Sequence, residues 1–597
     1  MILDEDQQKV VDLNDGHYAI LAGAGSGKST VLLHRTARLY MADPTRKILC
    51  VTFTSEAAKN LRNRIAKQFF GVELSIFSTL HALALKFAIN HPEAFPFHLS
   101  ENPLADESLS ARAVFDAIGD KISFKAFTSW VSLQKRNRVS AIDAVQKAER
   151  TGQKLDYAIG YKRYQSLLKK QGILDFDDLI YYMVEILESD KDLRRLWQYD
   201  YVMQDEAQDA CELDWVLLQL LTERRNNLLC VGDSGQALYG FRGGAAHHLL
   251  NMDDMFPGTR TLMLGRNYRS LPEIVEAGKK AYPYPSIAQN FKAVRDGLAT
   301  VSVLPYATLF REAEQVISMA KLYKAEETAV LSRTNLALRA IEEECLNQNL
   351  QYHILGDSGF WESPEVENIL HYLRAMVFRT DASIQSAIRT PFWPTKYVKK
   401  KQVVEKVKSY IQKGLKATEC LWMIPELTEF NNTLTNLSSH IRHLNAQGWV
   451  ESTIKHLKAI EHYAGEDNVS PDRNPVANLK ELVRAASKHG SIGEFLDFVR
   501  RLSYARQQRK GVCLSTIHQA KGKEWKNVFL ISVNENVLPH IKSNDIEEEK
   551  CCFFVGVSRA EDNLHISFYD TPSRFLEPFI EIKNEEQTQR LLSDTPS

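Results

Sequence analysis

A glycine-rich turn followed by a lysine and hydroxyls stands near the start of the chain, in the stretch ILAGAGSGKST. It follows the phosphate-binding pattern G-x-x-x-x-G-K-[ST], with alanine at the first glycine position. Backbone N–H groups of residues 23–28 and the start of the next helix would bind nucleotide phosphates. Lys28 would reach the β- and γ-phosphate oxygens, and Ser29 would ligate Mg²⁺. The residues predicted to line this ATP site are Ala22, Gly23, Ala24, Gly25, Ser26, Gly27, Lys28, Ser29 and Thr30.

Two adjacent carboxylates form the second candidate site. In YDYVMQDEAQD an apolar run ends on Asp205 and Glu206. The carboxyl ends of parallel strands form the edge where α/β proteins bind ligands. Asp205 would hold Mg²⁺, and Glu206 would orient and deprotonate an attacking water. The simpler alternative is a solvated acidic turn. The phosphate-binding stretch elsewhere in the chain makes this alternative less favoured.

Short β-rich apolar runs alternate with helical patterns along the whole chain. They are HYAILAG, KILCVTF, YDYVMQDE and NLLCVGD in the first half, and TAVLSRT, VCLSTIHQ, NVFLISV and NLHISF in the second. Such alternation predicts parallel sheets, and each group is interrupted by a long helical stretch. We therefore expect an α/β protein with two lobes, each carrying a mainly helical insertion. The predicted limits are 1–93 with 195–275 for the first lobe, 94–194 for its insertion, 276–379 with 508–597 for the second lobe, and 380–507 for its insertion.

Composition and charge exclude few partners but narrow the class of protein. The chain has 597 residues, 44% of them hydrophobic and 25% charged, which suits a protein of about four domains. No apolar run is long enough to cross a bilayer, and the amino terminus lacks a signal-peptide pattern. Eight cysteines occur without metal-ligand spacing, as expected in a reducing cytoplasm. The net charge of −1 neither favours nor excludes nucleic acid, so such binding must come from a local groove.

An ordered series of short blocks resembles the motifs of the superfamily 1 helicases of the UvrD/Rep type. The blocks are LDEDQQ, AGAGSGKS, VTFTSEAA, STLHALA, QDEAQD, VGDSGQALYGFRGG, LGRNYRS, YHILGDSGFWE, STIHQAKGKEW and EEEKCCFFVGVSRA, and the matches span residues 3 to 575. One block would be weak evidence, whereas the series makes coincidence negligible. The resemblance implies two RecA-like motor lobes that use ATP and Mg²⁺ and act on single-stranded DNA and its junctions with duplex.

The same resemblance assigns roles on the nucleotide side. Gln7 would read the adenine edge and Tyr268 would stack on the base. In AKGKEW, Gly522 would also line the nucleotide site and Glu524 would accept from the ribose. Gln236 would sense the γ-phosphate and report it to the DNA-binding strand. Arg269 and Arg559 would act as arginine fingers from the second lobe, with a surface salt bridge as the alternative for each. The implied catalytic set is Lys28, Asp205, Glu206, Gln236, Arg269 and Arg559.

On the nucleic-acid side, aromatic residues lie among polar loop residues. Phe53, Tyr239 and Phe241 resemble the positions where family members stack single-strand bases, which suits movement along any sequence. The predicted contacts to the sugar-phosphate backbone are Thr54, His81, Arg242, Thr516 and His518. Core packing remains the alternative for Phe53 and Phe241, and an interior position for His81.

The departures from the family pattern bear on what this member does. Thr30 stands where relatives carry an arginine that sandwiches the adenine, so base recognition is expected to be looser. Ser234 and Gly235 replace acidic residues. Phe241 stands where tryptophan is usual, and Lys550 and Cys551 replace a pair of arginines near the lobe interface.

The largest departures lie where relatives contact duplex. In the family a long β-hairpin follows the last strand and acts as a wedge, but here NLHISFYD runs almost directly into Pro572. Only residues 569–571 remain to turn the chain, too few for a protruding hairpin. The family's T-P-T-R-G-I-G segment is replaced by TPFWPTKYVKKK, whose lysines offer either non-specific phosphate contacts or a solvated helix face.

We expect an ATP-driven motor that moves 3′→5′ along single-stranded DNA and separates duplex ahead of it. One alternative keeps the motor but replaces unwinding with the stripping of bound proteins. Another class of protein, a nucleotide-switched DNA-binding scaffold, is disfavoured because Lys28, Glu206, Arg269 and Arg559 are all retained. The expected location is the cytoplasm, on DNA, and the compact insertions would suit a phage or mobile-element origin.

Overall fold

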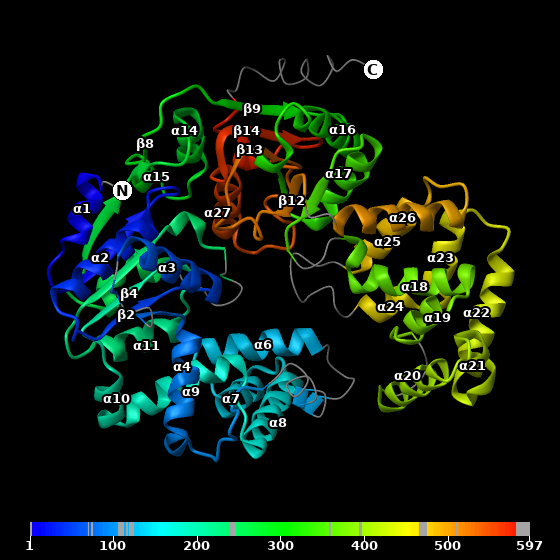
Figure 1. Cartoon of the computed structure of the whole chain (residues 1–597), viewed down its shortest axis with the longest axis horizontal. Coiled ribbons are helices and arrows are strands. Elements are labelled where there is room, and N and C mark those ends of the chain that lie inside the picture. The colour runs from blue at the N-terminus through cyan, green and yellow to red at the C-terminus, as the bar shows by residue number, and fades with distance from the viewer. Residues whose placement is uncertain are drawn as a thin grey trace.

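The chain folds around two six-stranded parallel sheets, each in its own lobe (Figure 1). The computed structural model describes residues 3–69, 71–72, 76–105, 113–114, 117–118, 124–238, 240, 246–356, 360–392, 397–464, 475–507 and 510–580. In Figure 1 the lobes lie next to each other, with one group of helices below the first lobe and another beside the second. The predicted α/β class with two parallel-sheet lobes and helical insertions is confirmed.

The first sheet has the strand order β3-β2-β4-β5-β1-β6. Its central strands are apolar and buried on both faces, as parallel strands covered by helices must be. Register pairs Leu21 with Gly232 and Val51 with Gln204, so the strands end together at one edge. The strands are β1 (His17–Ala22), β2 (Ile48–Val51), β3 (Phe77–Ser78), β4 (Tyr201–Gln204), β5 (Leu228–Gly232) and β6 (Arg260–Leu264). Helices of this lobe are α1 (Glu5–Val11), α2 (Lys28–Ala42), α3 (Ser55–Gln68), α4 (Leu80–Asn90), α11 (Glu212–Thr222), α12 (Ala246–Leu250) and α13 (Met252–Met255).

The second sheet has the order β11-β12-β10-β13-β14-β9 and is also parallel throughout. Its strands are β9 (Thr300–Pro305), β10 (Thr328–Ser332), β11 (Tyr352–Ile354), β12 (Val512–Thr516), β13 (Trp525–Leu530) and β14 (Ala560–Phe568). Helices α14 (Pro272–Ala281), α15 (Pro285–Ala288), α16 (Leu309–Ala320), α17 (Asn335–Asn347) and α27 (Ile546–Val557) belong to this lobe, and β7 (Arg266–Asn267) pairs with β8 (Lys292–Ala293) where the chain crosses between lobes. Ala24 and Leu238 of the first lobe share a hydrophobic cluster with Val275 and Phe554 of the second, so the lobes are in contact.

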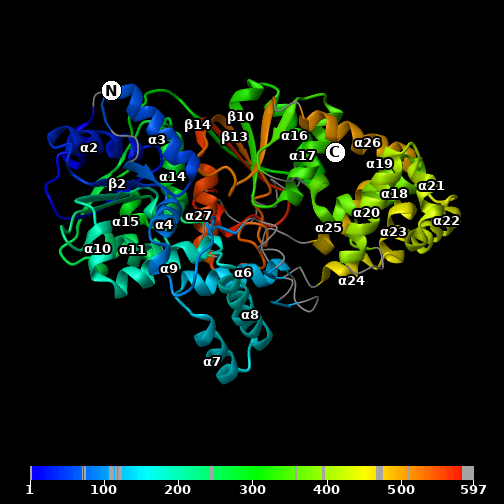
Figure 2. The ribbon, with the colours of Figure 1, turned by 60° about the horizontal axis from the view of Figure 1, so that its bottom comes forward.

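Two groups of helices interrupt the lobes. Figures 1 and 2 agree that α6–α8 project from the first lobe and that α18–α26 lie beside the second. The first group is α6 (Phe124–Arg136), α7 (Ala141–Thr151), α8 (Leu155–Gln171), α9 (Phe176–Ser189) and α10 (Lys191–Trp197). The second is α18 (Pro364–Phe378), α19 (Asp381–Ile388), α20 (Tyr397–Gln412), α21 (Ala417–Met423), α22 (Thr428–Ile441), α23 (Ala446–His456), α24 (Ala459–Tyr463), α25 (Pro475–Ala486) and α26 (Ile492–Gln507).

Side-chain packing suggests three changes to the domain limits that the sequence predicted. Helix α9 buries Met183 and Leu187 in the hydrophobic cluster of the first lobe, together with Leu217 of α11. Helix α14 packs on the second lobe, and α18 contacts the helices α22, α23 and α25. We propose that α9 joins the first lobe, that the second lobe begins before α14, and that its insertion begins at α18.

A buried ionic cluster joins α6 to α9 at the base of the first insertion. Lys135 Nζ lies 2.6 Å from Asp175 Oδ2 and 2.7 Å from Asp178 Oδ1, and the Lys135 side chain is almost fully enclosed. Asp175 caps α9 and also accepts a hydrogen bond from the Tyr164 hydroxyl at 3.0 Å. Burial and the charge of Asp175 raise the pKa of Asp178 to about 6, against the opposing effect of Lys135. The lysine therefore neutralises the fully buried Asp178 and the largely buried Asp175.

Changing Lys135 to methionine is expected to destabilise α6 and α9 by about 3–5 kcal/mol, because it leaves buried carboxylates without a counter-charge. Hydrogen–deuterium exchange of peptides from these helices would measure the loss. Lys147→Met, on the exposed face of α7, is the matched control and should change stability by less than about 0.5 kcal/mol. Equal protection in the two variants would contradict this account of the cluster.

All eight cysteines are buried, and each is present as a thiol. Among the described residues, no helix combines the length and apolar character needed to cross a membrane.

Candidate nucleotide site and nucleic-acid groove

The predicted phosphate loop connects β1 to α2 at the carboxyl edge of the first sheet. Gly27 has φ +84° just before α2, and a side chain there would meet Gln7 Nε2 at 2.7 Å. Gln7 donates from Nε2 to the Ser26 carbonyl at 3.0 Å, while the Ser26 hydroxyl donates to the Gly23 carbonyl at 2.8 Å. These hydrogen bonds fix the turn that precedes α2. The N-terminus of α2 and its backbone N–H groups are thus available to a phosphate.

The two carboxylates after β4 lie beside this loop. Ser29 Oγ is 3.5 Å from Asp205 Oδ2, and Asp205 is only 5% exposed. Glu206 has φ +51°, a strained conformation typical of functional positions, and it accepts from Gln208 Nε2 at 2.6 Å. A hydroxyl and a carboxylate oxygen side by side are the hard oxygen ligands that suit Mg²⁺, so the residues present fit the ion.

The electrostatics of the carboxylate pair distinguish its members. Burial and the neighbouring Glu206 charge raise the pKa of Asp205 to about 7, against the effect of Lys28. Burial also opposes ionisation of Glu206, but Lys28 and Lys521 outweigh it and hold the pKa of Glu206 below its usual value. At neutral pH Glu206 is therefore ionised and can accept a proton from water.

Arg559 of the second lobe reaches the first lobe at Gln236. Its side chain is 1% exposed, and NH2 donates to Gln236 Oε1 at 3.1 Å. Burial and the charge of Arg269 lower the pKa of Arg559 to about 9, above neutrality, so the group stays charged. Lys521 makes a second cross-lobe contact, with Asp209 at 2.6 Å and the Gln236 carbonyl at 2.6 Å. Two residues of the second lobe, Arg559 and Lys521, thus hold Gln236 of the first.

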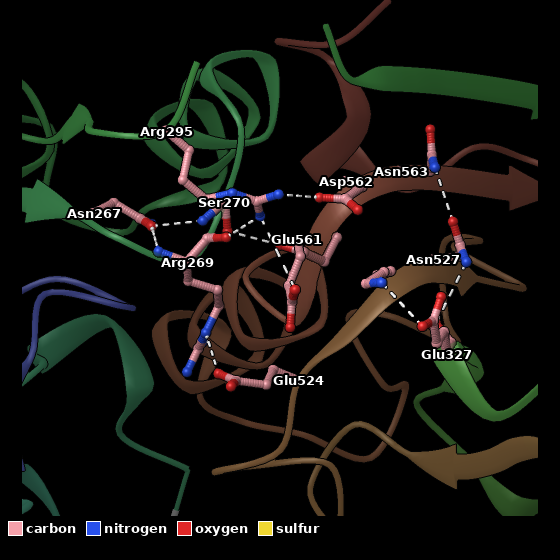
Figure 3. A network of polar contacts seen from close by, with 12 residues as sticks. Asn267, Arg269, Ser270, Arg295, Glu327, Glu524, Asn527, Glu561, Asp562 and Asn563 are labelled. Carbon is pink, nitrogen blue, oxygen red and sulfur yellow. Dashed lines mark hydrogen bonds and ion pairs between the residues drawn. The ribbon is translucent and has the colours of Figure 1, made fainter. Parts of the chain in front are cut away.

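Arg269 is paired with Glu524, the predicted ribose acceptor (Figure 3). Nε of Arg269 lies 2.5 Å from Glu524 Oε2, and NH1 donates to the Ser558 carbonyl at 3.2 Å. Asn267 Oδ1 accepts from the backbone N–H groups of Arg269 and Ser270, each at 2.8 Å, and so fixes the turn that presents the arginine. Both predicted residues lie together, and Asn267 is a positioning residue that the motif comparison missed.

Arg64, which the sequence analysis did not single out, lies near the expected position of the base. Tyr268 donates from its hydroxyl to Asp4, and its backbone N–H donates to the Gly25 carbonyl at 2.9 Å. Thr30 accepts from Arg64 NH2 of α3 at 3.0 Å, so an arginine distant in sequence lies beside the threonine that replaces the family's arginine. Gly522, with φ +79°, lies at the turn before Glu524.

A second site opens on the first lobe, beside the start of α9. Phe53, Thr54, His81 and Phe176 line a cavity of about 300 Å³ together with Arg136. Phe53 is 37% exposed, which favours ligand contact over core packing, and Thr54 caps α3 through Ala57 N at 3.1 Å. His81 is half-buried and stacks on Phe176 with ring centroids 4.0 Å apart. Burial lowers the pKa of His81, so its ring is neutral at pH 7. Phe176, exposed at the start of α9, is a further aromatic that sequence reasoning missed.

The remaining predicted DNA contacts are less exposed or lie outside the described residues. Thr516 is buried and its hydroxyl accepts from Gln519 N at 3.4 Å, while the half-buried His518 lies 4.0 Å from Cys552 Sγ. Tyr239, Phe241 and Arg242 fall outside the described residues. The roles of all five in DNA binding stay predictions.

The turn after β14 is as short as the sequence indicates. β14 ends at Phe568, and Pro572 already pairs with Asn534. Backbone hydrogen bonds from Glu535 N to the Thr571 carbonyl and from Ser573 N to the Val533 carbonyl, both 3.0 Å, hold the chain against the second lobe. The segment between β14 and Pro572 therefore forms no hairpin.

Comparison of the sequence with known proteins supports the same assignment of a nucleotide site between two lobes. The family model described as the UvrD/REP helicase N-terminal domain matches residues 3–257, and the UvrD-like helicase C-terminal domain matches residues 262–571. ATP-dependent DNA helicase PcrA of Staphylococcus epidermidis is 27% identical over 637 residues, covering 96% of this chain and 86% of the relative. The PcrA protein of Leuconostoc citreum is also 27% identical, with 95% and 81% covered. ATP-dependent DNA helicase Rep of Buchnera aphidicola is 26% identical and covers 96% of each chain. With both family models matched in order and the motif residues gathered at one lobe interface, the chain belongs to the UvrD/Rep helicase family.

Proposed function

We propose that this protein is an ATP-dependent DNA helicase that moves 3′→5′ along single-stranded DNA and opens the duplex ahead of it. The observation that carries the proposal is the cross-lobe contact of Arg559 with Gln236, the predicted γ-phosphate sensor. Any change in the distance between the lobes must alter this contact. ATP turnover is thereby linked to relative motion of the lobes.

The residues around the phosphate loop would divide the chemistry of hydrolysis. Lys28 and the N-terminus of α2 bind the phosphates, and Ser29 with Asp205 would hold Mg²⁺. The ion, when bound, would neutralise charge that develops on the phosphate oxygens. Glu206 accepts the proton of the attacking water, while Arg559 and Arg269 place positive charge on the opposite side of the site. Gln7 and Tyr268 would hold the base.

The proposed DNA contact begins at Phe53, whose exposed ring lies at the cavity beside α9. Phe53→Ala is expected to weaken binding of a labelled oligothymidine by about 1–3 kcal/mol, because a base loses its stacking partner. Fluorescence anisotropy would measure the affinity. As the matched control, Phe310→Ala removes a ring of similar exposure from α16, and it should leave the affinity for the oligothymidine unchanged. Equal affinity of the Phe53 variant and the wild type would remove Phe53 from the DNA path.

The short turn at residues 569–571 supports a second candidate, a translocase that strips proteins from single strands with little unwinding. A strand-displacement assay with 3′- and 5′-tailed duplexes separates the two. Displacement from the 3′-tailed substrate is expected. Displacement from the 5′ tail alone would overturn the polarity, and no displacement from either, with translocation retained, would favour the stripping translocase.

A further inference from the structure

One tyrosine of the second lobe inserts its hydroxyl into the first. Tyr282 follows α14, and its side chain is 2% exposed. The hydroxyl donates to Asp233 Oδ1 at 2.8 Å and accepts from Gly235 N at 3.2 Å. Asp233 and Gly235 directly follow β5 of the first lobe. The tyrosine is therefore a polar contact across the lobe interface, next to the nucleotide site.

Asp233 also binds Gln236, the predicted γ-phosphate sensor. Its carboxylate is fully buried and accepts from Gln236 Nε2 at 2.7 Å on Oδ2. Because the amide nitrogen of Gln236 is used here, its oxygen faces Arg559 and accepts from NH2 at 3.1 Å. A continuous chain runs from Tyr282 through Asp233 and Gln236 to Arg559. Both ends of this chain belong to the second lobe and its middle to the first.

The space for the tyrosine depends on Gly235. A side-chain carbon at this glycine would lie 2.3 Å from Tyr282 Cε2, far inside van der Waals contact. The ring has little room to retreat, because it packs edge-on against Phe554 at 4.7 Å and Phe291 at 5.0 Å between centroids. Any side chain larger than that of glycine would therefore displace the ring. Gly235 and Tyr282 are thus a matched pair.

We propose that Tyr282 is a positioning residue for ATP hydrolysis, which sets the orientation of Gln236, and through it Arg559, by donating across the lobe interface to Asp233. This inference rests on the proposed function. A ring that served packing alone would not need its hydroxyl between a buried carboxylate and a backbone N–H. Without that donor the Asp233 carboxylate keeps only Gly235 N and Gln236 Nε2 as donors among the described residues. The carboxylate is then held less firmly, and so is the Gln236 amide that it orients toward Arg559.

The charges around Asp233 give the sign of a pH test. Burial raises its pKa, whereas Lys28, the Tyr282 hydroxyl and Gln236 lower it and Glu206 raises it. Cys551 of α27 and Arg559 also face this carboxylate. Removing the tyrosine hydroxyl raises the pKa of Asp233 further. The acidic limb of the kcat profile should therefore move to higher pH.

The first experiment compares ATPase kinetics of the whole protein and Tyr282→Phe, with and without single-stranded DNA. The variant is expected to lose about tenfold in kcat, with the KM for ATP within about twofold and the acidic limb shifted upward. Tyr323→Phe removes a hydroxyl that contacts His565 at 2.9 Å elsewhere in the second lobe, and it should behave as wild type. An unchanged kcat and pH profile for Tyr282→Phe would overturn the proposal. The proposal would also be overturned if Tyr282→Phe and Tyr323→Phe lowered kcat equally and lowered the melting temperature, which is the result expected if the Tyr282 ring served packing alone.

A double-mutant cycle tests the matched pair. Gly235→Ala should lower kcat strongly in the wild type by displacing the ring, but add little in a Tyr282→Leu background, where the ring is gone. Additive losses would overturn the proposal. Because kcat is also measured without DNA, a wild type indifferent to DNA would reject the motor function, while the role of Tyr282 would still be judged on basal turnover.

Discussion

Changing Glu206 to glutamine is expected to lower kcat for ATP hydrolysis by about 10²–10⁴, while ATP binding remains intact. The replacement has nearly the same shape. Its amide oxygen can still accept from Gln208 Nε2, which lies 2.6 Å from Glu206 Oε2 in the wild-type protein. What it loses is the basic carboxylate that Lys28 and Lys521 keep ionised. The Glu206 charge also raises the pKa of Asp205, so its removal favours ionised Asp205. Binding of ATP with Mg²⁺ should therefore be at least as tight as in the wild type.

Steady-state ATPase rates and equilibrium binding of a labelled ATP analogue would separate these effects. Glu212→Gln is the matched control, because it changes a carboxylate of the same lobe that pairs with His248 away from the phosphate loop. That variant should hydrolyse ATP normally. Wild-type turnover in Glu206→Gln would reject its assignment as the base.

Changing Arg559 to alanine is expected to lower kcat by about 10³–10⁵, the usual effect of removing an arginine finger. The guanidinium is buried at the lobe interface and donates to Gln236 and to the Val555 and Lys523 carbonyls. Alanine would leave those acceptors without their donor and so reduce stability as well. Arg559→Lys keeps the charge but lacks the planar fork, so it should recover stability more than turnover.

Arg333 offers a matched comparison for Arg559. It is also buried in the second lobe, but it pairs with Glu549 at 2.7 Å within that lobe. Arg333→Lys should affect thermal stability more than kcat, the reverse of Arg559→Lys. If Arg559→Lys hydrolyses ATP at the wild-type rate, its role as a finger is wrong.

The interior of both sheets was predictable from sequence, whereas their edges were not. The eight apolar runs correspond to β1, β2, β4, β5, β10, β12, β13 and β14. Within the two six-stranded sheets, the strands missed are β3, β6, β9 and β11, which are their outer strands. β6 and β9 are largely exposed or half-buried, and β3 has only two residues. Such strands lack the continuous apolar pattern on which the prediction depended.

The candidate site divides in a similar way. Lys28, Ser29, Asp205 and Glu206 were predictable because each stands at a fixed distance from a strand end. The contacts of Tyr282 with Asp233 and of Arg64 with Thr30 were not, because they join segments that only the folded chain brings together. The domain limits that we propose depend in the same way on tertiary packing, because the contacts of α9 and α18 favour different units from those that the sequence pattern suggested.

The central claim is that energy from ATP is used for movement on DNA. It is tested most directly by the ATPase rate of the wild-type protein measured with increasing single-stranded DNA. We predict a strong, saturable rise, because DNA in the groove beside Phe53 favours the closed interface at which Arg559 meets Gln236. A rate that stays the same at every DNA concentration would contradict the account.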